Sequence, residues 1–190
     1  SFLPLIMTFQ IHNSISRFYF DYSDNREKLK IFISTIVLVT LILSLIVLGG
    51  LIYYLEDVLL FVFPNTEGYN NVFILSILAS FFGVFNSTFI NLIRVQQKAK
   101  IFMKTSLVIF IISLTLNILE VIVYERGVYG IIEASLISVI ISSFIYMYLV
   151  REFFTLEFDI SLIKEPLKFS FPLIPHSLSG FIFMYSDRII

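Results

Sequence analysis

Several ionisable side chains of this chain stand inside or at the edge of long apolar runs. In chain order they are His12, Arg17, Glu120, Glu133 and His176. A guanidinium can bind an anion, an imidazole can bind hydroxyl groups or relay a proton, and a carboxylate can accept a proton or a cation. These residues, with the amide of Asn13 beside His12, are the first candidates for a binding or coupling site.

Each candidate also has a purely structural interpretation. Arg17 stands at the end of its run, where a cation anchors a span to the water interface, and Arg94 has the same position in another run. His12 and His176 can form hydrogen bonds that hold helices together, and the two glutamates can lie at the interface. The residue types alone leave both interpretations open.

Two prolines make the last apolar run unusual. Pro172 and Pro175 lie inside it, His176 follows directly, and Asp187 and Arg188 stand near its far end as a possible ion pair. An interior proline removes a backbone donor and clashes with the preceding turn, so we predict a kinked or interrupted helix here. A kink alone and a kink that opens a cavity are both compatible with this pattern.

The sequence excludes several chemistries. It contains no cysteine, so thiolate metal sites and disulfides are excluded, and we predict no metal, no cofactor and no catalytic residue. A phosphate loop of the G-x-x-x-x-G-K-[ST] type is also missing. The net charge of -1 says nothing about nucleic acid by itself, but the positive charge follows the topology and forms no basic face, so we predict no nucleic-acid partner.

The apolar runs are long enough to cross a bilayer. Hydrophobic residues make up 58% of the chain and the mean hydropathy is +0.94. About 20 apolar residues in a helix span a hydrocarbon core. We predict an all-α, multi-pass membrane protein with a first span ending near residues 17–20 and further spans at about 31–55, 72–93, 101–123, 130–150 and 169–186.

Positive charge alternates between the polar gaps. Eleven of the thirteen Lys and Arg residues fall in every second gap, whereas residues 56–71 contain none. Basic loops remain on the cytoplasmic side, so we expect Arg26 and Lys98 to be cytoplasmic and Asn65 and Gly127 to face outward. Gly127 and Gly130 permit a tight reversal, which predicts an antiparallel hairpin.

The spans suggest three parts. We expect residues 1–150 to form an amino-terminal transmembrane lobe, residues 151–168 a cytoplasmic amphipathic linker, and residues 169–190 the truncated first helix of a second lobe. Because the chain starts with Ser1 and ends at Ile190 while still apolar, we expect it to be an internal fragment of a longer protein.

Several motifs carry a family resemblance. They are R-F-Y-F-D-Y at 17–22, L-I-R-V-Q-Q-K-A-K at 92–100, G-V-Y-G at 127–130, and F-P-L-I-P-H-S-L-S-G at 171–180 followed by S-D-R. In this order and spacing the chain resembles the polysaccharide flippases of the multidrug/oligosaccharidyl-lipid/polysaccharide exporter superfamily, which export O-antigen (lipopolysaccharide) and capsule repeat units. The resemblance implies the second to sixth helices, and most of the seventh, of a protein with 12 or 14 helices. His12 and Asn13 depart from it, since small apolar residues or glycine are expected there.

The resemblance implies a bacterial inner-membrane transporter rather than an enzyme. Its substrate would be an undecaprenyl-diphosphate-linked oligosaccharide, and its partners the bilayer, a polysaccharide polymerase and the chain-length machinery. The head-group path would then use Arg17, His12, Asn13, His176, Asp187 and Arg188. Glu120 and Glu133 would couple transport to a proton or cation.

Two alternatives stay open at this point. A multidrug or cation antiporter of the same superfamily would share the fold and use an acidic pocket. A membrane glycosyltransferase or polymerase would need a large extramembrane loop with paired carboxylates, and these 190 residues contain no such loop.

Overall fold

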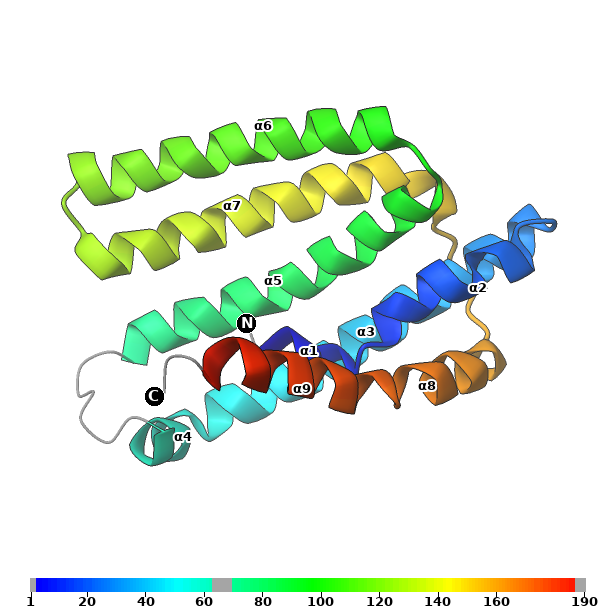
Figure 1. Ribbon diagram of the computed structural model, residues 1–190, viewed down its shortest axis with the longest axis horizontal. Helices are drawn as coiled ribbons and strands as arrows, with labels where there is room; N and C mark the ends of the chain where they lie inside the picture. The colour runs from blue at the N-terminus through cyan, green and yellow to red at the C-terminus, as the bar shows by residue number, and fades with distance from the viewer. Residues whose placement is uncertain (1–2, 63–69, 187–190) are drawn as a thin grey trace.

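The computed structural model describes residues 3–62 and 70–186, and it contains helices and no strand within those residues (Figure 1). The α-helices are α1 (Leu3–Thr8), α2 (Ser14–Tyr22), α3 (Arg26–Tyr53), α4 (Leu55–Val62), α5 (Asn70–Val95), α6 (Ala99–Ile118), α7 (Gly127–Val150), α8 (Lys164–Ser170) and α9 (Leu173–Ser186). Short 3-10 turns lie at Ile11–Asn13, Arg151–Phe153 and Ile160–Ile163, and a π-helical turn at Leu119–Val123.

Four helices are long and apolar enough to cross a membrane. They are Arg26–Tyr53, Asn70–Val95, Ala99–Val123 and Gly127–Phe153, with 25 to 28 residues each. These helices confirm the all-α, multi-pass fold and the four central spans. The first of them begins five residues before the expected position 31, because Asn25 caps it by accepting hydrogen bonds of 3.1 Å from the backbone N–H groups of Glu27 and Lys28.

Helices α5 and α7 are held together by small residues. Ala134, Ser138 and Ser142 recur every fourth residue along the buried face of α7. Asn86 of α5 donates a hydrogen bond of 2.5 Å to Ser142, and Ser143 donates one of 3.2 Å to the carbonyl oxygen of Phe82. Small residues allow two backbones to approach closely where lipid supplies no hydrophobic drive for association.

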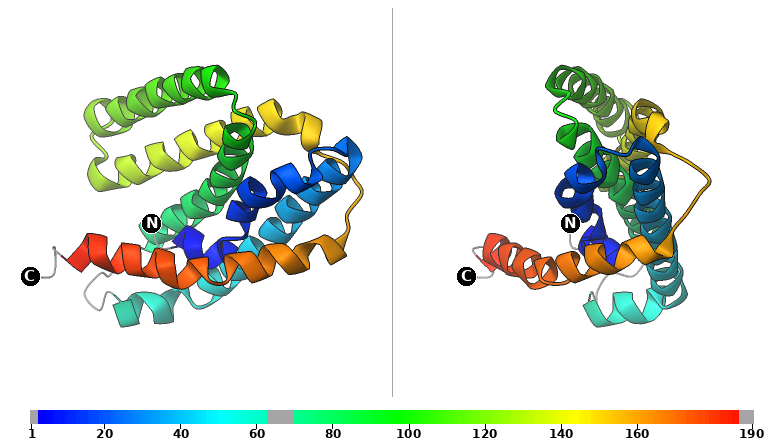
Figure 2. Two further views of the ribbon diagram at one scale, coloured as in Figure 1. Left: turned by 45° about the vertical axis from the view of Figure 1, so that its right-hand side comes forward. Right: turned by 90° about the vertical axis from the view of Figure 1, so that its right-hand side faces the viewer.

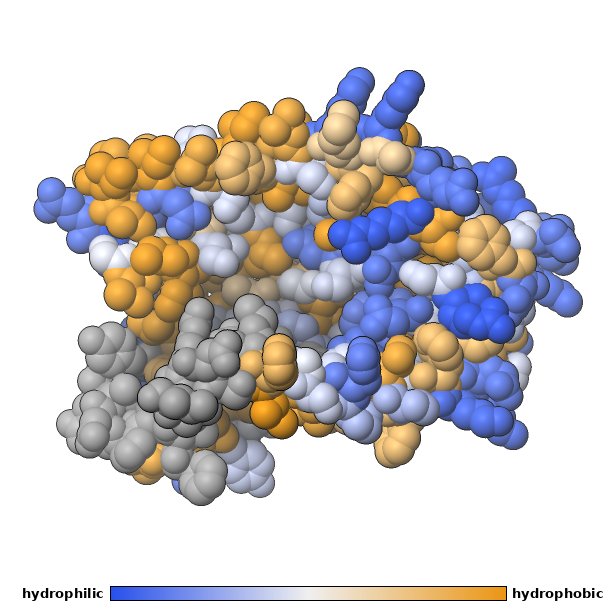
Figure 3. All heavy atoms as spheres, in the orientation of Figure 1, coloured by the Kyte–Doolittle hydropathy of each residue, from blue (hydrophilic) through white to orange (hydrophobic). Residues whose placement is uncertain are grey.

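Helix α6 forms the outer layer beside α7 (Figure 1). It has no buried residue, and apolar side chains such as Leu107, Phe110 and Ile111 are exposed. Figure 3 shows this apolar surface along the top of the view, and hydrophilic residues gathered at the right-hand end. A helix that is apolar all round and lies at the edge of a bundle is suited to contact lipid.

The predicted α6–α7 hairpin is confirmed, although its two glycines have different roles. Gly127 takes a positive φ of 55° at the reversal, as expected. Gly130 instead lies within α7, where an added Cβ would stand 2.8 Å from the carbonyl oxygen of Glu120. Gly130 therefore permits close approach of the two helix ends rather than the turn itself.

The first apolar run does not form one continuous helix. Phe9 and Gln10 have positive φ values of 45° and 59°, and the 3-10 turn Ile11–Asn13 separates α1 from α2. The hydroxyl of Thr8 accepts a hydrogen bond of 3.2 Å from the backbone N–H of Gln10. This local bond replaces a helical one, so the helix is interrupted inside the run. We call residues 9–13 the break of the first run.

The last run is interrupted as well. Helix α8 ends at Ser170 and α9 begins at Leu173, with Phe171 and Pro172 between them. Pro175 lies in the first turn of α9, where its missing N–H would have no intrahelical partner. The interruption therefore lies at Phe171 and Pro172, and in a continuous helix the ring of Pro175 would clash with the carbonyl oxygen of Phe171. Figures 1 and 2 show α8 and α9 as two successive helices with different directions.

The segment between α7 and α8 is bound to the bundle. The backbone N–H of Thr155 donates a hydrogen bond of 2.9 Å to Ser34, and that of Asp159 donates one of 3.1 Å to Thr35. Both hydroxyls belong to α3 and are buried. The helix α8 already begins at Lys164, inside the stretch that we expected to be linker.

The largest apolar core lies at the hydrophilic end of the bundle. Phe32 of α3, Ile15 of α2, Leu92 of α5 and Val150 of α7 meet there with Phe153. This core fixes the relative positions of α2, α3, α5 and α7. We call this end the basic end, because Arg26 and Lys98 lie there, and the end with Glu120 and Arg126 the opposite end.

Candidate functional site

The break of the first run gathers polar side chains inside an apolar bundle. Asn13 donates a hydrogen bond to the side chain of Gln10 and accepts one of 3.2 Å from Asn91 of α5. The turn Ile11–Asn13 packs against α2, α3, α5 and α8. Sequence reasoning selected Asn13 but missed Gln10 and Asn91, for which the only available signal was an amide within an apolar run.

His12 is buried in the same break. Its side chain is 9% exposed, and its Nδ1 atom has no hydrogen-bond partner within the described residues. Ser170 of α8 is also buried with an unpartnered hydroxyl, and α8 packs on the turn that carries His12. Leaving a buried polar atom without a hydrogen bond costs free energy. Among the described residues, the imidazole of His12 and the hydroxyl of Ser170 therefore remain available to form hydrogen bonds with a ligand.

Arg17 lies away from this polar cluster. Its guanidinium is 3.6 Å from the carboxylate of Asp21, one helical turn further on, and its side chain is 58% exposed. It also lies over the ring of Phe18. An exposed ion pair within one helix suits an anchor at the interface better than a buried anion site.

At the opposite end, Arg126 joins the two predicted coupling residues. Its Nη1 atom donates to Glu133 at 2.6 Å and to Glu120 at 3.1 Å. The hydrogen bond to Glu133 and the charge of Glu120 raise the pKa of Arg126. The side chain of Glu120 is 11% exposed and belongs to the π-helical turn at the end of α6. A proton or cation that bound here would have to displace this guanidinium.

The two described candidates on α9 are not gathered with the break. His176 and Pro175 lie on α9 with exposed side chains. Asp187 and Arg188, as well as Asn65, lie outside the described residues. The helix α8 does pack against α2 and the 3-10 turn of the break, so the two interrupted segments of the chain are neighbours (Figure 2).

Glu152 is a further residue that sequence reasoning passed over. Its two carboxylate oxygens accept hydrogen bonds from Arg26 at 3.0 Å and from Lys98 at 3.2 Å. The three residues come from the start of α3, the α5–α6 turn and the 3-10 turn that follows α7, so no local pattern could reveal the contact. Within residues 3–62 and 70–186, no group of three or more His, Asp or Glu side chains could hold a metal ion.

The arrangement is therefore a membrane helix bundle with polar side chains at a break near one end and an ion triad at the other. A family model described as "Polysaccharide biosynthesis protein" matches residues 1–190. Neither a curated protein nor a solved structure matches the chain. The match covers every residue and agrees with the resemblance carried by the motifs. The chain thus belongs to the polysaccharide biosynthesis protein family, the flippase family of the multidrug/oligosaccharidyl-lipid/polysaccharide exporter superfamily.

Proposed function

We propose that this protein moves an undecaprenyl-diphosphate-linked oligosaccharide from the cytoplasmic to the outer leaflet of the bacterial inner membrane by alternating access. Its family supports a membrane transporter that serves polysaccharide biosynthesis. The observation that carries the finer proposal is the break of the first run, where Gln10, Asn13 and Asn91 form a polar cluster inside the bundle.

The depth of this cluster suits an entry site for a sugar head group. Asn13, the N-cap residue of α2, precedes Arg17 by four residues, which is roughly 6 Å of helical rise, and Gln10 accepts a hydrogen bond from Asn13. We place Arg17 at the cytoplasmic interface, because the basic loops lie at this end. The amides then lie in the cytoplasmic half of the hydrocarbon core and offer both donors and acceptors to sugar hydroxyls.

The rest of the chain fits this proposal as one part of a larger transporter. Residues 1–150 would form the amino-terminal lobe, and α9 would begin the second lobe, which closes the cavity. The polymerase and the chain-length machinery would receive the exported units. Glu120 and Glu133 would be the coupling groups, with Arg126 as the cation that a proton or ion replaces.

The two alternatives have less support. A multidrug antiporter would use an acidic pocket, whereas the carboxylates of Glu120 and Glu133 both contact Arg126. A glycosyltransferase or polymerase would need paired carboxylates in an extramembrane loop. Non-enzymatic transport is therefore the function that we propose.

Replacing Asn13 and Asn91 together by leucine tests the proposal. We expect flipping of a fluorescent undecaprenyl-diphosphate oligosaccharide by the full-length protein in proteoliposomes to fall by about tenfold, because hydrogen bonds worth about 1.4 kcal/mol or more would be lost. Removing both partners of the contact keeps packing similar and leaves neither amide of this pair unpaired, while the side-chain oxygen of Gln10 loses its hydrogen bond from Asn13.

Asn117→Leu is the matched control, since Asn117 lies on the peripheral α6 and donates only to the carbonyl oxygen of Ser113. It should flip lipid at the rate of the unmodified protein. Equal rates for the control and the double variant, at equal protein abundance, would remove the break from the substrate path. Absence of flipping by the unmodified protein would refute the function itself.

Arg17→Lys distinguishes an anchor from a substrate contact. Because Arg17 is exposed and pairs with Asp21, we expect the lysine variant to keep the transport rate within about twofold, since topology depends on charge and not on shape. Lysine cannot reproduce the bidentate fork of arginine on a phosphate. Surface polysaccharide at matched expression is the measurement, and a severe loss in the lysine variant would return Arg17 to the substrate path.

A further inference from the structure

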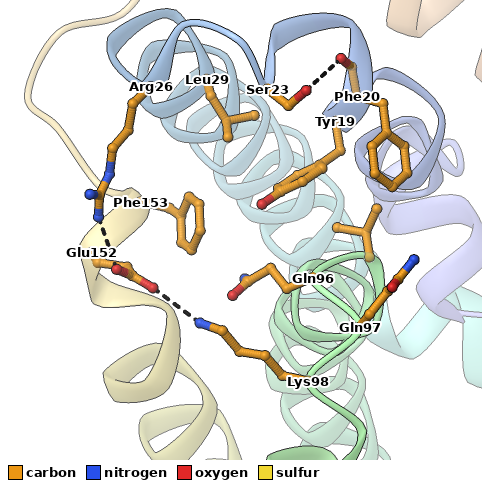
Figure 4. A pocket seen from close by; sticks show the side chains of 11 residues that line it. Tyr19, Phe20, Ser23, Arg26, Leu29, Gln96, Gln97, Lys98, Glu152 and Phe153 are labelled. Carbon is orange, nitrogen blue, oxygen red and sulfur yellow. Dashed lines mark hydrogen bonds and ion pairs between the residues drawn. The ribbon is translucent and has the colours of Figure 1, made fainter.

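A groove of about 530 Å³ opens at the basic end, away from the break of the first run. Its walls are the end of α2, the start of α3, the α5–α6 turn and the turn Arg151–Phe153. The polar side chains of Tyr19, Arg26, Gln96, Lys98 and Glu152 line it. Figure 4 shows Tyr19, Gln96 and Phe153 pointing into the groove, with Glu152 between Arg26 and Lys98 at one side.

The charges in the groove are arranged around a single anion. Arg26 and Lys98 each donate to a different oxygen of Glu152, at 3.0 and 3.2 Å. The side chain of Arg26 is 70% exposed, so this contact is accessible to solvent and weak. Two cations converging on one carboxylate leave a net positive charge, and the carboxylate can be displaced by a stronger anion.

The backbone adds to the positive potential. Gln97 has a positive φ of 55°, which turns the chain sharply before α6. Lys98 then occupies the N-cap position of α6 without a side-chain capping bond. The backbone N–H groups of Ala99 and Ile101 already donate to the carbonyl oxygens of Gln97 and Lys98, so the start of α6 contributes the positive end of its dipole and not a set of free donors. A guanidinium beside an ammonium favours phosphate oxygens.

The position of the groove favours a phosphate carried by a lipid. Phe20, which lines the groove, is exposed, and Leu29 and Phe153 form an apolar wall. The groove begins at Tyr19, past Arg17 along α2. With Arg17 placed at the cytoplasmic interface, as proposed above, the groove lies at the level of the lipid head groups. A phosphate bound here could remain attached to chains in the bilayer.

We propose that this groove binds the phosphate of a lipid head group, and that Glu152 occupies the phosphate position when no lipid is bound. The phosphate would bind Arg26 and Lys98, and Glu152 would turn toward solvent. The ligand is either the diphosphate of the lipid-linked precursor or the phosphate of an anionic phospholipid. The first case rests on the proposed function and makes the groove a loading site before the break, whereas the second is independent of it.

Binding assays test the site without requiring transport. The full-length protein in neutral phosphatidylcholine nanodiscs is titrated with fluorescent undecaprenyl diphosphate in one arm and fluorescent phosphatidylglycerol in the other. We expect Glu152→Gln to tighten binding by about threefold to tenfold, because a competing anion is removed. Arg26→Gln with Lys98→Gln should weaken binding by about tenfold or more.

Matched variants separate the groove from general charge. Glu157 lies in the same inter-helix segment as Glu152 but outside the groove, so Glu157→Gln is the control for the loss of a carboxylate. Replacing Lys28 and Lys100 together by glutamine is the control for the loss of two cations, because neither residue lines the groove. Neither control should change affinity by more than about twofold, as solvent and salt screen distant charges. Thermal unfolding of every variant establishes that folding is retained.

The outcomes decide the proposal and identify the ligand. Equal tightening by Glu157→Gln and Glu152→Gln would refute a specific site, and so would weaker binding by a folded Glu152→Gln variant. A response restricted to undecaprenyl diphosphate would assign the groove to the transported lipid, and a response restricted to phosphatidylglycerol would assign it to a structural lipid. Phosphate binding in the groove with no flipping by the unmodified protein would retain the site and refute the proposed function.

Discussion

Replacing Pro172 and Pro175 together by alanine is expected to slow transport by about tenfold while leaving the protein as stable as before or more stable. Alanine supplies the missing N–H and removes the ring clash, a gain of about 3 kcal/mol for a helix interior. The helices α8 and α9 would then join through residues 171 and 172 into one straight helix. If this joint bends when the two lobes exchange between inward- and outward-open states, straightening it traps one state.

Pro175→Ala is the control that the structure supplies. Pro175 lies in the first turn of α9, where a backbone N–H has no partner, so its replacement should change the transport rate by less than about twofold. Flipping rate and melting temperature are measured for both variants of the full-length protein. Normal flipping by a stably expressed variant with both prolines replaced would leave these prolines with a packing role only.

Gly130→Ala should lower the free energy of unfolding by about 1 to 3 kcal/mol, the usual cost of overpacking. The new Cβ would lie 2.8 Å from the carbonyl oxygen of Glu120 and 3.0 Å from the Cβ of Arg126. The first neighbour is backbone and cannot rotate away. The two helix ends would have to separate, which would also disturb the contacts of Arg126 with Glu120 and Glu133.

Gly83→Ala is the matched substitution in α5, because nothing lies within 4 Å of its added Cβ. It should be neutral or stabilise the protein by up to about 1 kcal/mol through helix propensity. Thermal unfolding of the detergent-solubilised protein gives both values. A Gly130→Ala variant as stable as Gly83→Ala would show that the hairpin end can relax around a methyl group.

Hydropathy and charge predicted the central spans because both are sums over neighbouring residues. A helix in lipid must satisfy its own backbone, so an uncharged run of sufficient length has one available structure. The four helices from Arg26 to Phe153 bear this out. The motifs also indicated the family, which the match over residues 1–190 confirms.

The first run shows that hydropathy summed over neighbouring residues does not predict whether a helix is continuous. It is apolar enough to predict a span, yet Phe9 and Gln10 have positive φ and the helix is broken. The amides of Gln10, Asn13 and Asn91 bond to one another, and this pairing joins residues 78 positions apart. A hydropathy value is calculated for one segment, so it does not include the free energy of a hydrogen bond to another segment.

The sequence by itself determined a multi-pass helical membrane protein, its hairpin, its basic loops and its family. Only the tertiary structure decided which polar groups meet: Arg126 with both glutamates, Glu152 with Arg26 and Lys98, and the inter-helix segment with Ser34 and Thr35. Span formation depends on the transfer of each segment into lipid, which is local. The pairing of polar groups depends on how the spans and their connecting turns pack, and it joins residues as far apart as Arg26 and Glu152, which are 126 positions apart.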